Sequence, residues 1–263
     1  MENEPSRACF RFYAELNDHL PQEQQYKTLE KAFFTSSTVK DMIESFGVPH
    51  TEIDLIIANG QPVDFSYLVK HGDRIAVYPT FESFYITPEQ RLRPQSLRNP
   101  KFILDVHLGK LAAYLRMLGF DADYGRSFTD ARLAQISASE HRILLTRDRG
   151  LLKRGSITQG YWVRETNSRA QIAEVIYRFN LAQAIRPFTR CMACNGALEP
   201  VSKEQAQNLV PERSFERYEE FHRCEQCGRI YWKGSHYARM RRWVEELAPS
   251  KIRSGGMPNA ESK

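Results

Sequence analysis

The sequence lacks the features of a membrane or secreted protein. No apolar run approaches the roughly 18 residues that a membrane-spanning helix needs. The N-terminus, MENEPSRACF, has neither the basic start nor the apolar core of a signal peptide. Cysteine is scarce, with 5 in a chain of 263 residues. We therefore expect a cytoplasmic protein with no membrane partner, in a compartment that keeps thiols reduced.

Positive charge is scarce in the first third of the chain and abundant afterwards. Residues 1–90 contain 7 Lys and Arg against 14 Asp and Glu, whereas residues 91–263 contain 30 against 18. Such a basic excess points to a polyanion partner for the C-terminal two-thirds of the chain, most simply a nucleic acid. The alternative is that the surplus arginines are solvated surface. A hydrophobic content of 41% and a length of 263 residues suit two or three globular domains.

Four of the five cysteines form two CxxC pairs. Cys191 and Cys194 make the first pair, and Cys224 and Cys227 make the second. This spacing predicts a tetrahedral zinc ion, and because every ligand is a cysteine the zinc is structural rather than catalytic. The rival interpretation, redox-active dithiols, expects a thioredoxin-like βαβ context that is absent. Cys9 lies in an alternating strand pattern and is most simply a buried thiol.

The first 86 residues carry the pattern of a small β-rich domain. Strands are predicted at 7–16, 28–34, 54–58 and 74–78, with a helix over 39–46 that Thr38 caps and Gly47 ends, and a short element at 65–68. This order resembles the β-grasp fold of ubiquitin, and residues 39–79 look like the ThiS and MoaD sulfur carriers. Those carriers act through a free C-terminal diglycine, whereas here the last strand runs on into residues 80–85. A binding or positioning role, with a protein partner, is therefore the better expectation for domain 1–86.

Residues 87–100 mix proline and arginine and predict an extended linker, whose arginines could instead follow a phosphate backbone. Beyond it, buried strands alternate with helices over 101–187, which predicts a parallel α/β sheet. The strand at 102–104 ends at Asp105, Asp130 opens a helix, and the strand at 143–145 leads to Asp148. Further elements are a helix over 108–118 that Gly119 ends, a strand at 161–163 and a helix over 171–179. Residues 188–248 hold the zinc ribbon and a helix, and the tail 249–263 has a disordered composition.

Ligands of parallel α/β sheets gather beyond the carboxyl ends of the strands, where Asp105 and Asp148 stand. Carboxylates gathered there favour Mg²⁺ or Mn²⁺, which predicts metal-assisted phosphodiester hydrolysis. Each aspartate also has a plainer explanation. Asp105 and Asp130 suit helix caps, and Asp148 suits surface pairing with a neighbouring arginine.

Three longer segments carry a specific resemblance. They are KFILDVHLGKLAAYLRMLGFDADY, HRILLTRDRGLL and RCEQCGRIYWKGSHYARM, and they resemble the Mut7-C ribonuclease domain, a PIN-like nuclease family with an attached zinc ribbon. A β-grasp domain in front matches the Mut7-C ubiquitin/RNase architecture. The resemblance implies that Asp105, Asp130 and Asp148 bind the catalytic Mg²⁺ or Mn²⁺. The fourth acid of many PIN domains would fall after the strand at 161–163, where this sequence has Glu165 and Asn167 as candidate ligands but no aspartate.

Several cations and aromatic rings are candidates for holding RNA. Lys110 and Arg147 lie close in sequence to the aspartates and suit phosphate binding. Rings and cations after the second cysteine pair suit single-stranded RNA, although the rings could equally pack the ribbon core. These candidates are Trp232, Lys233, His236, Tyr237 and Arg239. The sequence thus predicts a metal-dependent ribonuclease, and the alternative is a non-catalytic RNA- or ribosome-associated adaptor.

Overall fold

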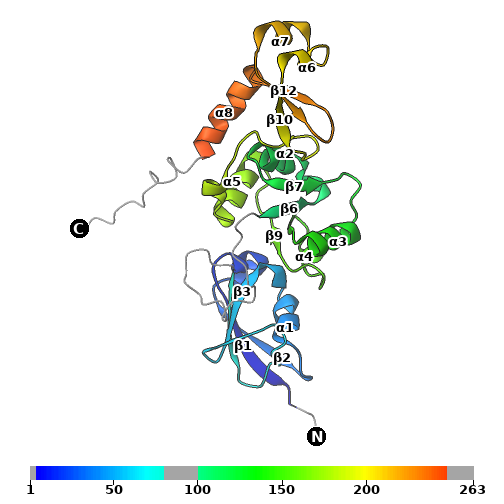
Figure 1. Cartoon of the computed structure of the whole chain (residues 1–263). Coiled ribbons are helices and arrows are strands. Elements are labelled where there is room, and N and C mark those ends of the chain that lie inside the picture. Colours follow the sequence, from blue (N-terminus) through cyan, green and yellow to red (C-terminus); the bar gives the residue numbers. More distant parts are fainter. Residues whose placement is uncertain (1–3, 80–99, 248–263) are drawn as a thin grey trace, which may run out of the picture. The chain divides into compact units, whose positions relative to one another are not determined.

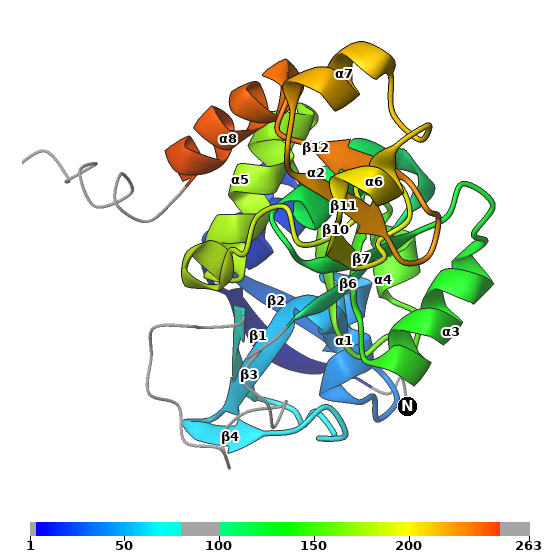
Figure 2. The ribbon, with the colours of Figure 1, turned by 45° about the horizontal axis from the view of Figure 1, so that its top comes forward.

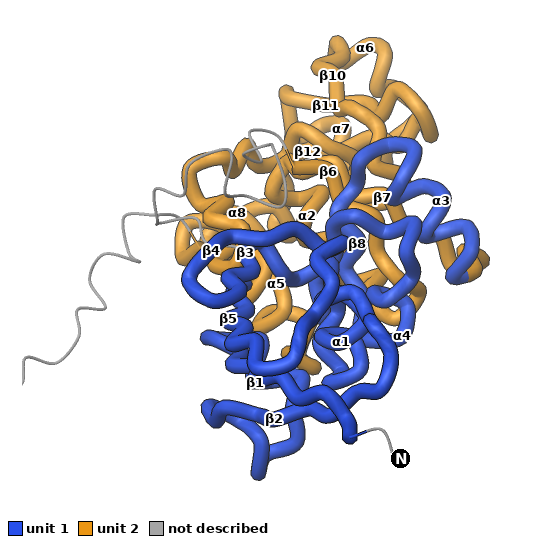
Figure 3. The backbone as a smooth tube through the Cα atoms, turned by 90° about the horizontal axis from the view of Figure 1, so that it is seen from below, with its two compact units in different colours: residues 1–98, 130–162 blue, residues 99–129, 163–263 orange. Residues whose placement is uncertain are grey.

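The computed structural model of the chain describes residues 4–79 and 100–247 (Figure 1). It divides into two compact units, which Figure 3 colours separately. Unit 1 comprises residues 1–98 and 130–162, and unit 2 comprises residues 99–129 and 163–263. The predicted linker up to residue 99, the strand continuation at 80–85 and the predicted tail lie outside the described residues.

Unit 1 begins with a β-grasp domain, as predicted. Its five-stranded sheet has the order β2-β1-β5-β3-β4, in which β1 and β5 are parallel and the other neighbours are antiparallel. The helix α1 (Val39–Ser45) packs on this sheet (Figure 1), Thr38 caps its start, and Gly47 follows its end with a φ of 99°. The strands are β1 (Ser6–Phe12), β2 (Thr28–Phe33), β3 (Ile53–Ala58), β4 (Gln61–Val63) and β5 (Arg74–Pro79).

Three details of this domain differ from the sequence-based expectation. The strand β4 was not predicted, because its residues follow directly on the Asn59-Gly60 turn. The first strand ends at Phe12 instead of residue 16, because the buried Asn17 amide donates to the carbonyl oxygens of Phe12 and Ala14, both at 3.0 Å. The chain then turns into a 3₁₀ helix, Ala14–His19. No helix or strand forms at residues 65–68, where Leu68 makes a single bridge to Thr38. Elsewhere Cys9 is partly buried in β1 and forms no disulfide.

Unit 1 continues with a second set of elements from the central region. They are α3 (Asp130–Glu140), β8 (Ile143–Thr146), α4 (Arg149–Leu152) and β9 (Gly160–Trp162), and β8 and β9 are parallel. Every residue of β8 is buried, as its apolar run predicts. The short helix α4 is not among the predicted elements, since four residues are too few to show a helical period.

Unit 2 begins with the remaining α/β elements. Strands β6 (Lys101–Leu104) and β7 (Asp121–Tyr124) are parallel, and the helix α2 (Gly109–Met117) connects them. A second helix, α5 (Ser168–Arg178), contacts α2. Parallel strand pairs joined by helices confirm the predicted α/β class of the central region. The strand β7 was not predicted, because two of its four residues are aspartates and its one buried residue, Ala122, is small.

The rest of unit 2 is the cysteine-containing ribbon and a final helix. The ribbon is a three-stranded antiparallel sheet in the order β10-β11-β12. Two short helices separate the first two strands, and α8 runs beside α5 (Figures 1 and 2). The elements are β10 (Leu198–Val201), α6 (Lys203–Ala206), α7 (Glu212–Arg217), β11 (Phe221–Cys224), β12 (Ile230–Trp232) and α8 (Ser235–Leu247).

Candidate functional site

The four CxxC cysteines converge on one point of the ribbon. Their sulfur atoms all lie within 4.8 Å of one another, with Cys191 and Cys227 at 3.6 Å and Cys194 and Cys224 at 3.3 Å. A tetrahedral zinc ion with Zn–S bonds of about 2.3 Å separates its ligand sulfurs by about 3.8 Å. The cluster therefore has the size of a Cys₄ zinc site, which confirms that these four residues are able to bind zinc together.

Tight turns bring the sulfurs of each pair together. The amide of Asn195 donates to the carbonyl of Cys191 at 2.9 Å, and the amide of Gly228 donates to the carbonyl of Cys224 at 3.0 Å. Both turn residues have positive φ angles, 73° at Asn195 and 69° at Gly228. Asparagine and glycine are the residues that tolerate this conformation best, so the local sequence selects the two knuckles.

Ionisation of the cluster is uneven. Burial opposes ionisation of Cys191, but a hydrogen bond from the Tyr231 hydroxyl and bonds from backbone amides outweigh it and lower the pKa of Cys191 to about 6. The Tyr231 oxygen lies 3.1 Å from the Cys191 sulfur, and burial together with this contact raises the pKa of Tyr231. Burial is the main reason that the pKa of Cys194 rises to about 12. The Cys191 thiolate thus forms readily, whereas Cys194 would need a divalent cation beside it to ionise.

A buried arginine joins the first knuckle to the α/β part of unit 2. Arg116 on α2 is 4% exposed, and its Nε donates to the carbonyl of Ala122 at 2.7 Å. Its Nη1 donates to the carbonyls of Met192 and Ala193 at 3.2 and 2.9 Å. Burial lowers the pKa of Arg116 below its usual value, and the nearby Asp123 carboxylate opposes that shift. The guanidinium nevertheless stays charged, and so it places a cation on the backbone between Cys191 and Cys194.

Asn195 reinforces the same connection from the ribbon side. Its side-chain oxygen accepts the amide of Ala122 at 3.1 Å, and its amide donates to Asp121 at 2.7 Å. Both polar atoms of the Asn195 side chain, its oxygen and its nitrogen, are therefore hydrogen-bonded to β7. Sequence reasoning missed Arg116 and the contacts of the Asn195 side chain with β7. The residues that these contacts join lie more than 70 positions apart in the chain.

The three candidate catalytic aspartates have different surroundings. Asp105 directly follows β6 and is 8% exposed, and its side chain does not cap the following turn. Asp130 is the first residue of α3, and its exposed carboxylate lies 3.6 Å from Arg154. Asp148 caps α4, accepting the amides of Gly150 at 2.7 Å and Leu151 at 3.4 Å. Asp105 belongs to unit 2, whereas Asp130 and Asp148 belong to unit 1.

The two residues at the expected fourth position, Glu165 and Asn167, form hydrogen bonds with residues of α5. Asn167 caps this helix, accepting the amide of Arg169 at 2.9 Å. The amide of Glu165 donates to Glu174 at 3.1 Å, while the Glu165 side chain is exposed. The cap role of Asn167 was missed, although an asparagine before Ser-Arg-Ala is a recognisable helix start. Within residues 4–79 and 100–247, one group of three or more potential metal ligands converges on a common point, and it is the cysteine cluster.

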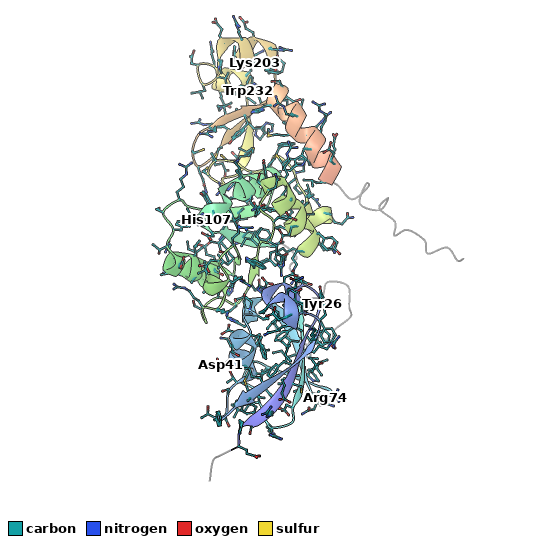
Figure 4. The ribbon with its side chains drawn as sticks, turned by 180° about the vertical axis from the view of Figure 1, so that it is seen from behind. Tyr26, Asp41, Arg74, His107, Lys203 and Trp232 are labelled. Carbon is teal, nitrogen blue, oxygen red and sulfur yellow. The ribbon has the colours of Figure 1, made fainter. Side chains whose placement is uncertain are left out.

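The basic and aromatic candidates divide into packed and exposed residues. Tyr237 packs its ring 4.6 Å from Phe188, and Lys233 forms an ion pair with Glu220. Trp232, labelled in Figure 4, is half-buried on β12 opposite Phe221. The exposed candidates are Lys110, Lys233, His236 and Arg239, and Arg147 is partly exposed.

A β-grasp domain, parallel α/β elements and a four-cysteine ribbon together define a mixed α/β protein with a ubiquitin-like domain and a metal-binding module. The family model of the Mut7-C RNAse domain matches residues 100–244, and that of the Mut7-C ubiquitin domain matches residues 6–85. The chain therefore belongs to the Mut7-C RNAse domain family, which indicates a ribonuclease type of function. No curated protein matches the chain. Among the helices of the described residues, none combines the length and hydropathy needed to cross a bilayer.

Proposed function

We propose that this protein is a metal-dependent ribonuclease in which Asp105, Asp130 and Asp148 hold Mg²⁺ or Mn²⁺ at the site of RNA hydrolysis. The observation that carries the proposal is the match of residues 100–244 to a ribonuclease family. Its chemistry is supported by aspartates that follow strands of parallel pairs or open helices, where oxygen ligands for a hard cation are expected.

In this proposal the carboxylates of Asp105, Asp130 and Asp148 would hold the metal, which would supply activation of a water molecule and neutralisation of charge on the scissile phosphate. The chain's own residues supply the rest. The carboxylates fix the metal, and Lys110 and Arg147 bind phosphate oxygens. The exposed side chains of His236 and Arg239, with Trp232, hold single-stranded RNA near the ribbon, which zinc keeps folded. Glu165 is the remaining acidic side chain able to complete the metal ligands.

The test is cleavage of a panel of RNAs by the full-length, zinc-loaded protein with added Mn²⁺ or Mg²⁺. Asp105→Asn and Asp148→Asn are the informative variants. Asparagine caps helices about as well as aspartate, so Asp148→Asn removes the charge and keeps the cap of α4. Glu216→Gln, an exposed change on α7, is the matched control. We expect each aspartate variant to lose at least about 100-fold in cleavage rate, within the range for removing one electrostatic group from an active site. Cleavage by the double variant at the rate of the natural protein would refute the proposal.

A second function is favoured by one observation. Asn167, at the expected fourth position, caps α5 instead of offering a carboxylate. If the metal site is incomplete for that reason, the protein is a non-catalytic adaptor that binds RNA or ribosomes. RNA binding that weakens steeply with salt, without metal-dependent turnover, distinguishes this function from the first.

A further inference from the structure

Two segments that lie far apart in the sequence interlock within unit 1. Trp162, the last residue of β9, donates its backbone amide to Glu52 Oε1 at 2.5 Å. Its ring centroid lies 5.2 Å from that of His19. Glu52 ends the 3₁₀ helix His50–Glu52, and His19 ends the 3₁₀ helix Ala14–His19. The ubiquitin-like domain therefore holds the end of a strand that belongs to the ribonuclease region.

The two side chains that contact Trp162, those of His19 and Glu52, pair with each other and are buried. His19 Nε2 lies 2.9 Å from Glu52 Oε2, and both side chains are fully buried. The other ring nitrogen of His19 has no hydrogen-bond partner within the described residues. A buried polar pair gives little net stability, because removing both groups from water is costly. We interpret the His19–Glu52 pair as a means of fixing one arrangement of the ubiquitin-like domain and the end of β9.

The same domain also binds the backbone of α4 and the loop after it. The Thr51 hydroxyl donates to the carbonyl of Leu152 at 3.3 Å, and His50 Nε2 lies 2.9 Å from the carbonyl of Ile157. In the opposite direction, Lys153 of the ribonuclease region donates to the carbonyl of Glu44 in the ubiquitin-like domain at 3.0 Å. All three contacts involve main-chain oxygens, so they fix where the backbone runs.

These contacts surround the turn that carries Asp148. Arg149 donates to the carbonyl of His19 at 3.3 Å, and its guanidinium lies 5.0 Å from the centre of the Trp162 ring. Trp162 Nε1 donates to the carbonyl of Arg147 at 3.3 Å. The residues on both sides of Asp148 are thus tied to Trp162, and Trp162 is tied to Glu52 and His19.

We propose that Glu52 and His19 are positioning residues, through which the ubiquitin-like domain holds Trp162 and thereby fixes the turn that presents Asp148. The inference rests on the proposed ribonuclease function for the role of Asp148 in the reaction. Both side chains are fully buried, so they are assigned an action through Trp162 and not a direct contact with RNA. The face of the domain that carries His19, Glu44 and Glu52 is occupied by the chain itself, so a protein partner would have to bind another face.

The experiment measures amide hydrogen exchange at residues 147–152 in the full-length, zinc-loaded protein, followed by cleavage kinetics. Glu52→Ala removes the acceptor of the Trp162 amide, and Trp162→Phe removes the indole bond to Arg147 while keeping a ring. Glu23→Ala, an exposed change in the same domain, is the control. Glu52→Gln keeps an oxygen able to accept the Trp162 amide and serves as the rescue variant.

We expect both Glu52→Ala and Trp162→Phe to speed exchange at residues 147–152 by about tenfold or more, with Glu52→Gln closer to the natural protein and Glu23→Ala unchanged. The kcat for RNA should fall in parallel, with KM changed little. Exchange at 147–152 that stays unchanged in both Glu52→Ala and Trp162→Phe would overturn the inference. The exchange measurement does not depend on activity. If the natural protein cuts no RNA, the proposed function is refuted, and the exchange data still test the positioning role of Glu52 and His19.

Discussion

Replacing Arg116 with methionine tests how the four-cysteine ribbon is attached to the rest of unit 2. Methionine approximates the volume and the apolar stem of arginine, so packing is largely kept. What is lost is a cation that donates to three carbonyl oxygens, those of Ala122, Met192 and Ala193. Two of these carbonyls belong to the residues between Cys191 and Cys194.

The magnitude follows from the burial of the guanidinium. A hydrogen bond to a charged group contributes about 1.5–3 kcal/mol, and three bonds from one side chain do not add fully. Breaking a buried charged contact costs about 3–5 kcal/mol, which we take as the loss in unfolding free energy. For a protein of this size that corresponds to a fall in melting temperature of about 6–20 °C. Loss of a partner that orients metal ligands also weakens metal binding by about 10- to 100-fold.

The assays are thermal unfolding of the zinc-loaded protein and competition for zinc with a chromophoric chelator. Arg116→Lys should give an intermediate result, because a single ammonium keeps the charge and loses the fork geometry. Arg126→Met is the matched control, since Arg126 is exposed on the loop after β7. If Arg116→Met left the zinc affinity within twofold and the melting temperature within about 2 °C of the natural values, the reasoning about this buried cation would be wrong.

Three further predictions follow from the same structure. Removing zinc with a chelator should unfold the ribbon while the β-grasp domain keeps its amide protection, because structural zinc supplies about 10–16 kcal/mol to such modules. Gly119→Ala should destabilise unit 2 by more than about 1 kcal/mol in chemical denaturation, because φ is 92° there and a Cβ would overlap the carbonyl oxygen of Arg186. Asp73→Ala should lower the stability of the ubiquitin-like domain by about 3 kcal/mol in the same assay, since the buried carboxylate accepts bonds from Asn59, Tyr67 and the Lys70 amide. Natural-like stability of either variant, or a ribbon that stays protected without zinc, would contradict these expectations.

The features that the sequence predicted correctly depend on residues close together in the chain. The CxxC spacing identifies each pair of candidate ligands, because a metal ligand pair needs only local backbone geometry. The buried run Ile143–Thr146 and the Thr38 cap of α1 are read in the same local way. The β-grasp order followed from a succession of such signals, and its strands pair as the resemblance to ubiquitin implied.

The features that the sequence did not reveal depend on partners far away. Asp121–Tyr124 forms a strand despite two aspartates because it pairs with β6, and its Ala122 receives contacts from Arg116 and Asn195. A period-based prediction has no access to such partners. Asp148 shows a related ambiguity, since the same carboxylate caps α4 and is a candidate metal ligand. The cap differs from the arginine pairing that the sequence suggested for Asp148. The proposed catalytic role has to be tested by charge removal with the cap kept.

The contacts of the ubiquitin-like domain lead to a last prediction. Deleting residues 1–85 removes five hydrogen bonds that join this domain to residues 149–162. At about 1 kcal/mol each, they sum to about 5 kcal/mol, a large part of the stability of a domain. We therefore expect the shortened chain to lose protection from proteolysis first around α4 and β9. A shortened chain that resists proteolysis there as well as the full-length protein would mean that the domain is an independent appendage, and a free carrier or partner-binding role would then explain its position better.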